Sequence, residues 1–407
     1  MNVGIAPTLR YVIAFAAICG AFYSVLLART EFLLHQDTED SITKAARSLP
    51  TNPVYVARLA AWQPDQKVAL LKKAVALNPF DAESWIQLGL TAEMEGRNVS
   101  LAEHYYLQSA SVDKMFLPKW TLANFYFRHR REEDFFRWAT ATLDITPYPA
   151  EPVFSQMWLM TSDSERIGRA IPNRPGTLVA YLRFLTKEKH FSAIPPVVQR
   201  FVHALAQAHG TADAAVIDLL GSIEDRLLEA GQVEPALQIW SALTEAGWFR
   251  SGLPTLAEPL TNGAFHHPFL RHGFDWTPIS AAGISVAQHA DTGSVQIELT
   301  GAEEEHAVIL RQYVPLISGH SYRLTWKATS ERFHDTSGLT WHLYPLGKQQ
   351  SKSLTSPDLF SSQSPGWDFR WTEGTPGSVL VLEYNRPLGA VRANGNLKLN
   401  ALALRER

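Results

Sequence analysis

Three histidines crowd the stretch LTNGAFHHPFLRHGFDW, which covers residues 260–276. His266, His267 and His272 are of a type that binds zinc or transfers protons. Two observations argue against a metal or catalytic centre. The chain contains no H-E-x-x-H motif, and neighbours on a strand point to opposite faces, so His266 and His267 cannot easily hold one ion. We therefore expect no metal and no cofactor, and a first strand that packs through Phe265, Phe274 and Trp276.

Acidic residues offer a second kind of chemistry. The stretch GAEEEHAV places Glu303, Glu304 and Glu305 together, and a glycosidase needs a pair of carboxylates. Consecutive acids in a turn led by glycine are typical of solvated loops, so we expect these three to face water. His334 stands beside Asp335, but no G-x-S-x-G nucleophile elbow accompanies them. The sequence therefore predicts no catalytic residue and no enzyme.

Aromatic residues near predicted loops and strand ends offer a third kind, the stacking of sugar rings on exposed ring faces. The candidates for glycan contact are Trp341, Tyr344, Trp367 and Trp371, with His342 and Asp368 close by. An alternative stays open, in which two or more of the four fill the core. Trp326 alternates with Tyr322 and Leu324, and we assign it to the core.

The elements that must position these residues are short strands. After residue 252, segments such as SVQIELTG, SYRLTWKATS and NLKLNALAL alternate apolar and polar side chains between Gly, Pro, Ser and Asn. Six or more such strands in about 150 residues predict an antiparallel β-sandwich. LTNGAF followed by GFDW resembles the first strand of jelly-roll carbohydrate-binding modules. QYVPLISGHSYRLTWKA resembles a strand, glycine turn and strand of the same group, so the resemblance covers residues 258–407 and implies sugar binding.

Helical spacing dominates residues 40 to 250. In KVALLKKAVALNPFDAESWIQLGLTAEMEG, residues 67–96, the first helix ends at Asn78-Pro79 because proline removes a donor and restricts its predecessor. Trp85, Leu88 and Gly89 then match the W-x-x-L-G opening of the tetratricopeptide repeat, which this segment resembles. Trp120 opens a next unit at the same period, although Asn124 replaces its glycine.

Further segments match the tetratricopeptide repeat less regularly. Residues 219–248 place repeat positions in register at Leu220, Leu227, Gly231, Ala236 and Trp240. RPGTLVAYLRFL and IPPVVQRFVHALAQ are typical of a degenerate hairpin, which gives four to six hairpins in all. We expect Phe125, Phe135, Phe136 and Trp138 in the core between repeats. The resemblance implies a curved solenoid whose concave face binds peptides or protein surfaces.

The N-terminal segment carries the clearest signal for the location of the protein. Tyr11–Ala28 is uncharged, lies between Arg10 and Arg29, and spans about 27 Å as a helix, close to the hydrocarbon thickness of a bilayer. A cleaved signal peptide is the alternative, but Leu26 before Ala28 makes a poor cleavage site. The acidic stretch at 31–40 follows the span, which predicts a cytoplasmic N-terminus and an exported body. We expect an uncleaved single-pass anchor in a bacterial inner membrane, with the body in the periplasm.

Composition limits the partners. The chain of 407 residues has 37 Lys and Arg against 40 Asp and Glu, a net charge of -3, without a basic run. We therefore expect no nucleic-acid partner. The single cysteine, Cys19, cannot form an intramolecular disulfide.

Three parts follow from these patterns. Residues 1–30 form a cytoplasmic tip and transmembrane anchor, 31–252 an α-helical solenoid of tetratricopeptide-like hairpins, and 253–407 an antiparallel β-sandwich of the jelly-roll type. A single-pass repeat protein with this ending resembles bacterial proteins associated with exopolysaccharide. The resemblance implies a non-catalytic scaffold, or a glycan-recognition protein, that acts in envelope polysaccharide assembly or export. Its expected partners are other envelope proteins and polysaccharide. Two alternatives remain: a scaffold whose sandwich binds protein, and an envelope glycosidase or lyase.

Overall fold

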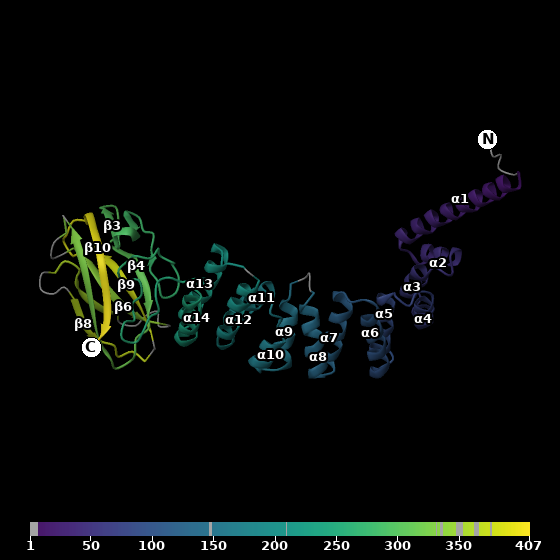
Figure 1. The fold of residues 1–407 in the computed structure, drawn as a ribbon, viewed down its shortest axis with the longest axis horizontal. Helices are drawn as coiled ribbons and strands as arrows, with labels where there is room; N and C mark the ends of the chain where they lie inside the picture. Colours follow the sequence, from purple (N-terminus) through teal and green to yellow (C-terminus); the bar gives the residue numbers. More distant parts are fainter. Residues whose placement is uncertain are drawn as a thin grey trace. The chain divides into compact units, whose positions relative to one another are not determined.

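The computed structural model describes residues 7–145, 149–208, 210–330, 332–333, 337–346, 353–361, 366–374 and 377–407. The chain divides into two compact units, Met1–Pro172 and Asn173–Arg407. Figure 1 labels the helices and strands of both units. Helices precede strands along the chain, and the strands form two antiparallel sheets, so the predicted fold class is confirmed.

The first unit is helical. Successive helices pack as antiparallel neighbours, as in α5 against α6 and α7 against α8. Its elements are α1 (Pro7–Gln36), α2 (Glu39–Ser48), α3 (Pro53–Trp62), α4 (Lys67–Leu77), α5 (Ala82–Met94), α6 (Val99–Val112), α7 (Phe116–Arg128), α8 (Glu132–Leu143), α9 (Glu151–Met160) and α10 (Ser164–Ala170).

The α5–α6 hairpin shows why the repeat residues pack. Leu88 is buried, and the backbone at Gly89 lies so close to the ring of Tyr106 on α6 that a Cβ would overlap it. Trp85 is only half-buried: its Nε1 donates to Pro79 O at 2.9 Å, and its ring lies beside Tyr105. Trp120 is also half-buried and stacks on Phe116. The expected inter-repeat core is confirmed at Phe125, Phe135 and Phe136, whereas Trp138 is half-buried.

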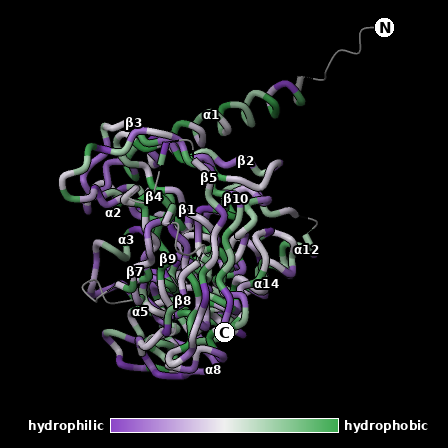
Figure 2. Tube along the Cα trace, turned by 90° about the vertical axis from the view of Figure 1, so that its left-hand side faces the viewer, coloured by the Kyte–Doolittle hydropathy of each residue, from purple (hydrophilic) through white to green (hydrophobic). Residues whose placement is uncertain are grey.

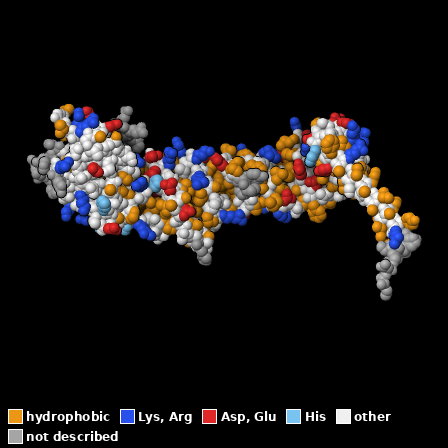
Figure 3. Space-filling view, turned by 90° about the horizontal axis from the view of Figure 1, so that it is seen from above, with side chains coloured by type: hydrophobic (Ala, Val, Ile, Leu, Met, Phe, Trp, Pro, Cys, Tyr) orange, Lys and Arg blue, Asp and Glu red, His pale blue; other side chains and the backbone are white. Residues whose placement is uncertain are grey.

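Helix α1 contains a long apolar stretch. Leu9–Gln36 is long and apolar enough to cross a membrane, with a mean hydropathy of 2.1 and none of its most apolar window buried. Figure 2 shows its hydrophobic residues along the helix, and Figure 3 shows orange side chains on its surface. The predicted span Tyr11–Ala28 lies inside this helix.

The second unit begins with four helices, which are α11 (Pro175–Lys187), α12 (Ile194–Gln207), α13 (Ala214–Glu229) and α14 (Val233–Glu245). The degenerate hairpin predicted in this region is confirmed as α11 packed on α12. At the α13–α14 turn Gly231 has a positive φ of 73°, a backbone conformation that favours glycine. Ala236 and Trp240 of α14 are fully buried.

The sandwich follows in the same unit. Its strands are β1 (Thr277–Pro278), β2 (Ile284–His289), β3 (Ser294–Thr300), β4 (His306–Val314), β5 (Ser321–Ser330), β6 (Leu339–Pro345), β7 (Leu354–Asp358), β8 (Gly366–Arg370), β9 (Ser378–Asn385) and β10 (Asn394–Glu406). One sheet has the order β1-β4-β9-β6-β7, and the other has the order β2-β3-β10-β5-β8. Side chains from the two inner faces, Trp326 among them as predicted, form one core.

One expectation about the sandwich was wrong. Residues 261–276 form turns and not a first strand, and β1 is only Thr277–Pro278. Positive φ angles at Asn262, Phe265 and Arg271 prevent a continuous extended backbone there. The packing role is nevertheless confirmed, because Phe265, Phe274 and Trp276 are buried.

Candidate functional site

The histidine-rich turn is a docking element within the second unit. His272 Nδ1 lies 2.7 Å from Asp225 Oδ2 and its Nε2 lies 3.2 Å from Asp218 Oδ1, both on α13. The Gly273 amide donates to the other oxygen of Asp225 at 2.8 Å. The hydrogen bond to Asp225, which outweighs partial burial, raises the pKa of His272. The turn therefore binds α13 through a charge-assisted pair.

Apolar contacts surround this pair. Trp240 of α14 packs edge-on against Phe274 with ring centroids 5.6 Å apart, and its Nε1 donates to Gly252 O at 2.8 Å. A Cβ at Gly221 would overlap the ring of His272, so glycine permits the close approach. His266 Nδ1 lies 3.2 Å from Ala290 O, and His267 is exposed. Within the described ranges, no group of three His, Cys, Asp or Glu is arranged to hold a metal ion.

The acidic stretch differs from its prediction at one residue. Glu304 and Glu305 are exposed as expected, and Glu305 pairs with Arg386. Glu303 is fully buried, so the expectation that it faces water was wrong. The turn folds back on itself, and Glu303 Oε2 accepts from the Gly301 amide at 2.9 Å. His334 and Asp335 lie outside the described residues.

The four aromatic candidates separate by exposure. Trp341 and Trp371 are 0% and 1% exposed, and Trp367 is 9% exposed, so all three are packed in the sandwich core. Their burial agrees with the alternative left open above, in which two or more of the four aromatic residues fill the core. Tyr344 is half-buried and keeps part of its surface accessible.

Tyr344 lies on the outer face of the β1-β4-β9-β6-β7 sheet. Leu339, Trp341 and Leu343 of β6 point into the core, so the alternating residues Thr340, His342 and Tyr344 point outward. On the neighbouring strand β9, Leu382 and Tyr384 face the core and Glu383 faces outward. We call Thr340, His342, Tyr344, His306, Thr355 and Glu383 the outer polar cluster.

Glu383 is the centre of this cluster. Its side chain is 4% exposed, and Tyr344 Oη donates to its Oε1 at 2.7 Å. His306 Nε2 of β4 lies 3.0 Å from its Oε2, and His342 Nε2 lies 3.5 Å from the same oxygen. The carboxylate on β9 thus holds side chains from the two neighbouring strands, β4 and β6, in one arrangement.

The surroundings set the protonation of the cluster. Burial, together with the hydrogen bond to Glu383, raises the pKa of Tyr344 to about 12, so this hydroxyl stays protonated and keeps donating. Burial lowers the pKa of His342, which keeps the imidazole neutral near pH 7. Its ring is stacked beside that of Tyr344, and Thr340 and Thr355 hydroxyls lie 2.9 and 3.2 Å from its nitrogens. Neutral donors and acceptors next to an aromatic ring suit a polyhydroxylated ligand.

Sequence reasoning missed Glu383 and His306. Glu383 stands in the apolar run SVLVLEYN, and a lone acid in an otherwise apolar strand was the available signal. His306 was passed over as part of GAEEEHAV, and 77 residues separate it from Glu383. No sequence pattern joins the two.

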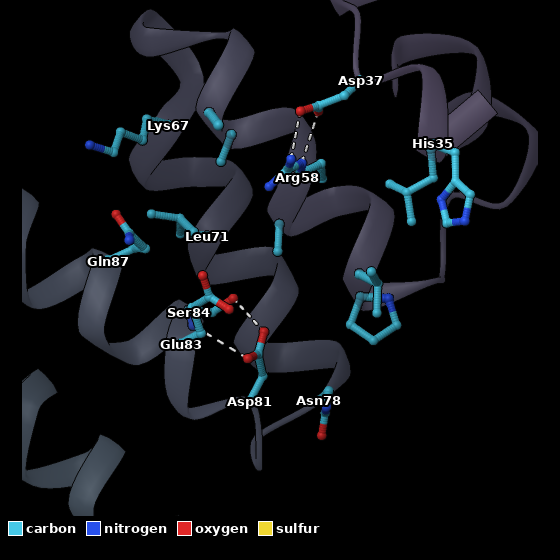
Figure 4. Close-up of a pocket in the computed structure, with 16 residues that line it drawn as sticks. His35, Asp37, Arg58, Lys67, Leu71, Asn78, Asp81, Glu83, Ser84 and Gln87 are labelled. Carbon is cyan, nitrogen blue, oxygen red and sulfur yellow. Dashed lines mark hydrogen bonds and ion pairs between the residues drawn. The ribbon is translucent and has the colours of Figure 1, made fainter. Parts of the chain in front are cut away.

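A second candidate site lies in the first unit. A groove of about 730 Å³ is lined by residues from the end of α1, from α3 and α4, and from the start of α5. Figure 4 shows Asp37 paired with Arg58 on one side and Asp81 bonded to Ser84 on the other. Ala57, Ala60 and Ala61 of α3 also line the groove, and their small side chains leave its middle open.

Comparisons with known proteins locate similar folds. No family model matches, and no curated protein matches. A solved structure of pilF from Pseudomonas aeruginosa is similar at 17% identity and a TM-score of 0.26, over 47% of this chain and 90% of that chain. YrrB, a TPR protein with a peptide-binding site, is similar at 11% identity and a TM-score of 0.23, over 51% of this chain and 93% of that chain. A CBM4 structure is similar at 12% identity and a TM-score of 0.25, over 36% of this chain and 98% of that chain. Likenesses at these scores do not assign a function.

Proposed function

We propose that this chain is a non-catalytic scaffold, anchored by α1 in a bacterial inner membrane, with its body in the periplasm. The observation that supports the proposal is the unburied apolar surface of α1. Phe15, Ile18 and Phe22 are 70%, 68% and 71% exposed, and contiguous apolar surface of this kind is costly in water. A bilayer removes that cost because the helix is long enough to cross it.

The charges on either side of the apolar stretch support the orientation. Arg10 precedes the stretch, and Arg29, Glu31 and Asp37 follow it. The side with Arg10 carries no acid next to the stretch, whereas acids outnumber Arg29 on the other side, so we assign the N-terminus to the cytoplasm and the helical repeats and the sandwich to the exported side. The groove between α1, α3 and α5 then supplies a surface for envelope proteins. The jelly-roll resemblance supports a role in polysaccharide assembly or export.

Topology can be tested on the full chain. Alkaline carbonate extraction should leave the chain in the membrane pellet, and alkaline phosphatase fused after Arg407 should be active. N-terminal sequencing should find no cleavage near Ala28. A soluble, processed chain, or an inactive phosphatase fusion with an active cytoplasmic reporter at the same position, would refute the anchor.

We propose glycan recognition as a second function, supported by the outer polar cluster. Its half-exposed Tyr344 ring can stack on a sugar, while the Thr340 and Thr355 hydroxyls, which contact the nitrogens of buried His342, can bond to sugar hydroxyls. A glycan-array screen of the detergent-solubilised chain tests the idea, with Tyr344→Ala as the variant. Tyr105→Ala is the control, because Tyr105 is a half-buried tyrosine of the helical unit.

The enzyme alternative makes a different prediction for the same cluster. If Glu383 acts in catalysis, Glu383→Gln abolishes turnover of a glycan that still binds. If the cluster only binds, Glu383→Gln changes glycan affinity, and Glu304→Gln and Glu305→Gln leave the envelope phenotype intact. Product analysis of a digested polysaccharide separates these outcomes.

A further inference from the structure

We propose that the groove between α1, α3 and α5 is a membrane-proximal docking site for the basic juxtamembrane segment of an integral membrane protein. The inference rests on the proposed membrane anchor and adds the position of the groove and the class of its occupant. Four features of the first unit carry it: the continuity of α1, its length beyond the apolar stretch, the charge of the groove, and the small residues on one face of α1.

Helix α1 enters the helical unit without a linker. It is one helix over Pro7–Gln36, and Thr30 near its end is fully buried. Thr30 Oγ1 lies 3.1 Å from Tyr55 Oη of α3, which also donates to Glu31 at 3.3 Å. Arg58 of α3 donates twice to Asp37, at 3.0 and 2.7 Å. These contacts hold α3 against the end of α1, so the groove keeps a fixed place relative to the anchor.

The groove opens next to the membrane surface. His35, which lines it, comes seven residues after Ala28, the last residue of the uncharged stretch. Seven helical residues rise about 10 Å. The headgroup layer on each side of a bilayer is roughly 5–8 Å thick. A segment bound in the groove therefore lies at, or just above, the headgroups.

The groove carries a surplus of negative charge. Arg58 is paired with Asp37, and Lys67 is paired with Glu95 outside the groove. On the opposite wall, Asp81 bonds only to the Ser84 amide and hydroxyl among the described contacts, and Glu83 is exposed. The cations of the groove are thus neutralised, whereas Asp81, the N-cap of α5, and Glu83 in its first turn form no ion pair among the described residues. A segment with Lys or Arg complements this wall, whereas an anionic lipid headgroup does not.

The transmembrane part of α1 favours an integral membrane partner. Ala17, Ser24 and Ala28 precede His35 by 18, 11 and 7 residues, which places them on the side of the helix that bears His35. Small residues on one face allow another membrane helix to approach closely. A partner helix on that face would emerge from the bilayer beside the groove, with its juxtamembrane residues within reach.

Site-specific photocross-linking in intact membranes tests the inference. The probe is p-benzoylphenylalanine, placed in the full chain at Ala61, which is exposed in the groove. The matched control is the same probe at Ala69 of α4, which is exposed and does not line the groove. We expect a cross-link from Ala61 alone, and mass spectrometry should place it on a basic segment within about ten residues of a transmembrane helix of another protein.

A charge substitution tests specificity. Glu83→Lys should lower the Ala61 cross-link about fivefold, the scale of one exposed charge pair. Glu39→Lys, in the first turn of α2 and away from the groove, should leave the yield unchanged. Glu39 lies closer to the anchor along the chain than Glu83 does, so its reversal controls for general repulsion near the membrane.

Three outcomes overturn the proposal. A cross-link to lipid, a cross-link to a protein without a transmembrane helix, or equal yields from Ala61 and Ala69 would each show that the groove does not hold a juxtamembrane segment. Carbonate extraction of the same membranes separates this failure from failure of the anchor. If the chain is extracted as a soluble protein, the proposed anchor fails; if it stays in the pellet, only the docking inference fails.

Discussion

His272 and Asp225 join the sandwich to the last helical hairpin through a contact of 2.7 Å between Nδ1 and Oδ2. The two residues are 47 positions apart, and the second acid on the same imidazole, Asp218, is 54 positions away. Trp240 and Phe274 pack beside the pair. The contacts that hold the hairpin α13–α14 to the sandwich therefore include a polar link that titrates, His272 to Asp225, and the aromatic contact beside it.

The link should weaken as the pH rises. The hydrogen bond to Asp225 raises the pKa of His272 in the folded state above its ordinary value of 6.5. The stabilisation is therefore complete below the ordinary value and is lost as the pH rises through the raised pKa. At pH 6, amide exchange in α13 should be faster in His272→Gln than in the unmodified chain. The free energy of opening should be about 1 kcal/mol lower in the variant at that pH. At pH 9 the difference between the two chains should be smaller. His289→Gln, on the exposed end of β2, is the control. If the difference between His272→Gln and the unmodified chain were the same at pH 6 and pH 9, the prediction of a titrating link would be contradicted.

Glu224 should destabilise the same hairpin. Its side chain is fully buried, and neither carboxylate oxygen has a hydrogen-bond partner among the described residues. Burial, with a smaller contribution from Asp225, raises its pKa well above the usual value. The folded state disfavours the charged form, so stability falls as the pH rises from the ordinary pKa of a glutamate towards the raised one. Glu224→Met, of similar volume, should raise the unfolding free energy by about 1–3 kcal/mol at neutral pH.

The pH dependence provides the check on this second prediction. The gain from Glu224→Met in urea unfolding should be smaller at pH 5 than at pH 8, because the native glutamate is protonated at the lower pH. A gain that does not change with pH would mean that packing, and not ionisation, sets the effect.

The sequence predicted the packing of residues whose signals lie within one helix or one strand. Leu88 and Gly89 were identified because one helix turn carries the whole motif, and Trp326 because alternation along one strand decides its face. The roles of His272 and Glu383 were missed because their partners are far away in the chain. Glu303 was misassigned since the fold of its own turn, and not its residue type, buries it.

Gly89 should tolerate no side chain. A Cβ there would overlap the Tyr106 ring, whose hydroxyl is held by Glu93 at 2.8 Å, so the ring cannot move without breaking that bond. Gly89→Ala should destabilise the α5–α6 hairpin by about 1–3 kcal/mol, measured by thermal unfolding. Gly176→Ala is the matched control, because it is also helical and has nothing within 4 Å of its added Cβ. It should be neutral or stabilise by up to about 1 kcal/mol. Equal effects at the two positions would contradict close packing at Gly89.

Tyr344 and Trp371 should respond in opposite ways to removal of their rings. Tyr344 is half-buried on the outer face, so Tyr344→Ala should weaken glycan binding by about 1–3 kcal/mol, the scale of one lost aromatic contact, while the chain stays folded. Trp371 is 1% exposed in the core, so Trp371→Ala should lower the unfolding free energy by about 3–5 kcal/mol. Isothermal titration with the glycan found on the array measures the first effect, and thermal unfolding measures the second.

Tyr344→Phe separates the ring from its hydroxyl. The phenylalanine keeps the stacking surface but removes the 2.7 Å bond to Glu383. If stacking dominates, the Phe variant binds glycan nearly as well as the unmodified chain; if Glu383 must be held in place, it binds as weakly as the Ala variant. Binding that survives Tyr344→Ala unchanged would remove the outer polar cluster as the glycan site and leave the sandwich as a protein-binding or structural domain.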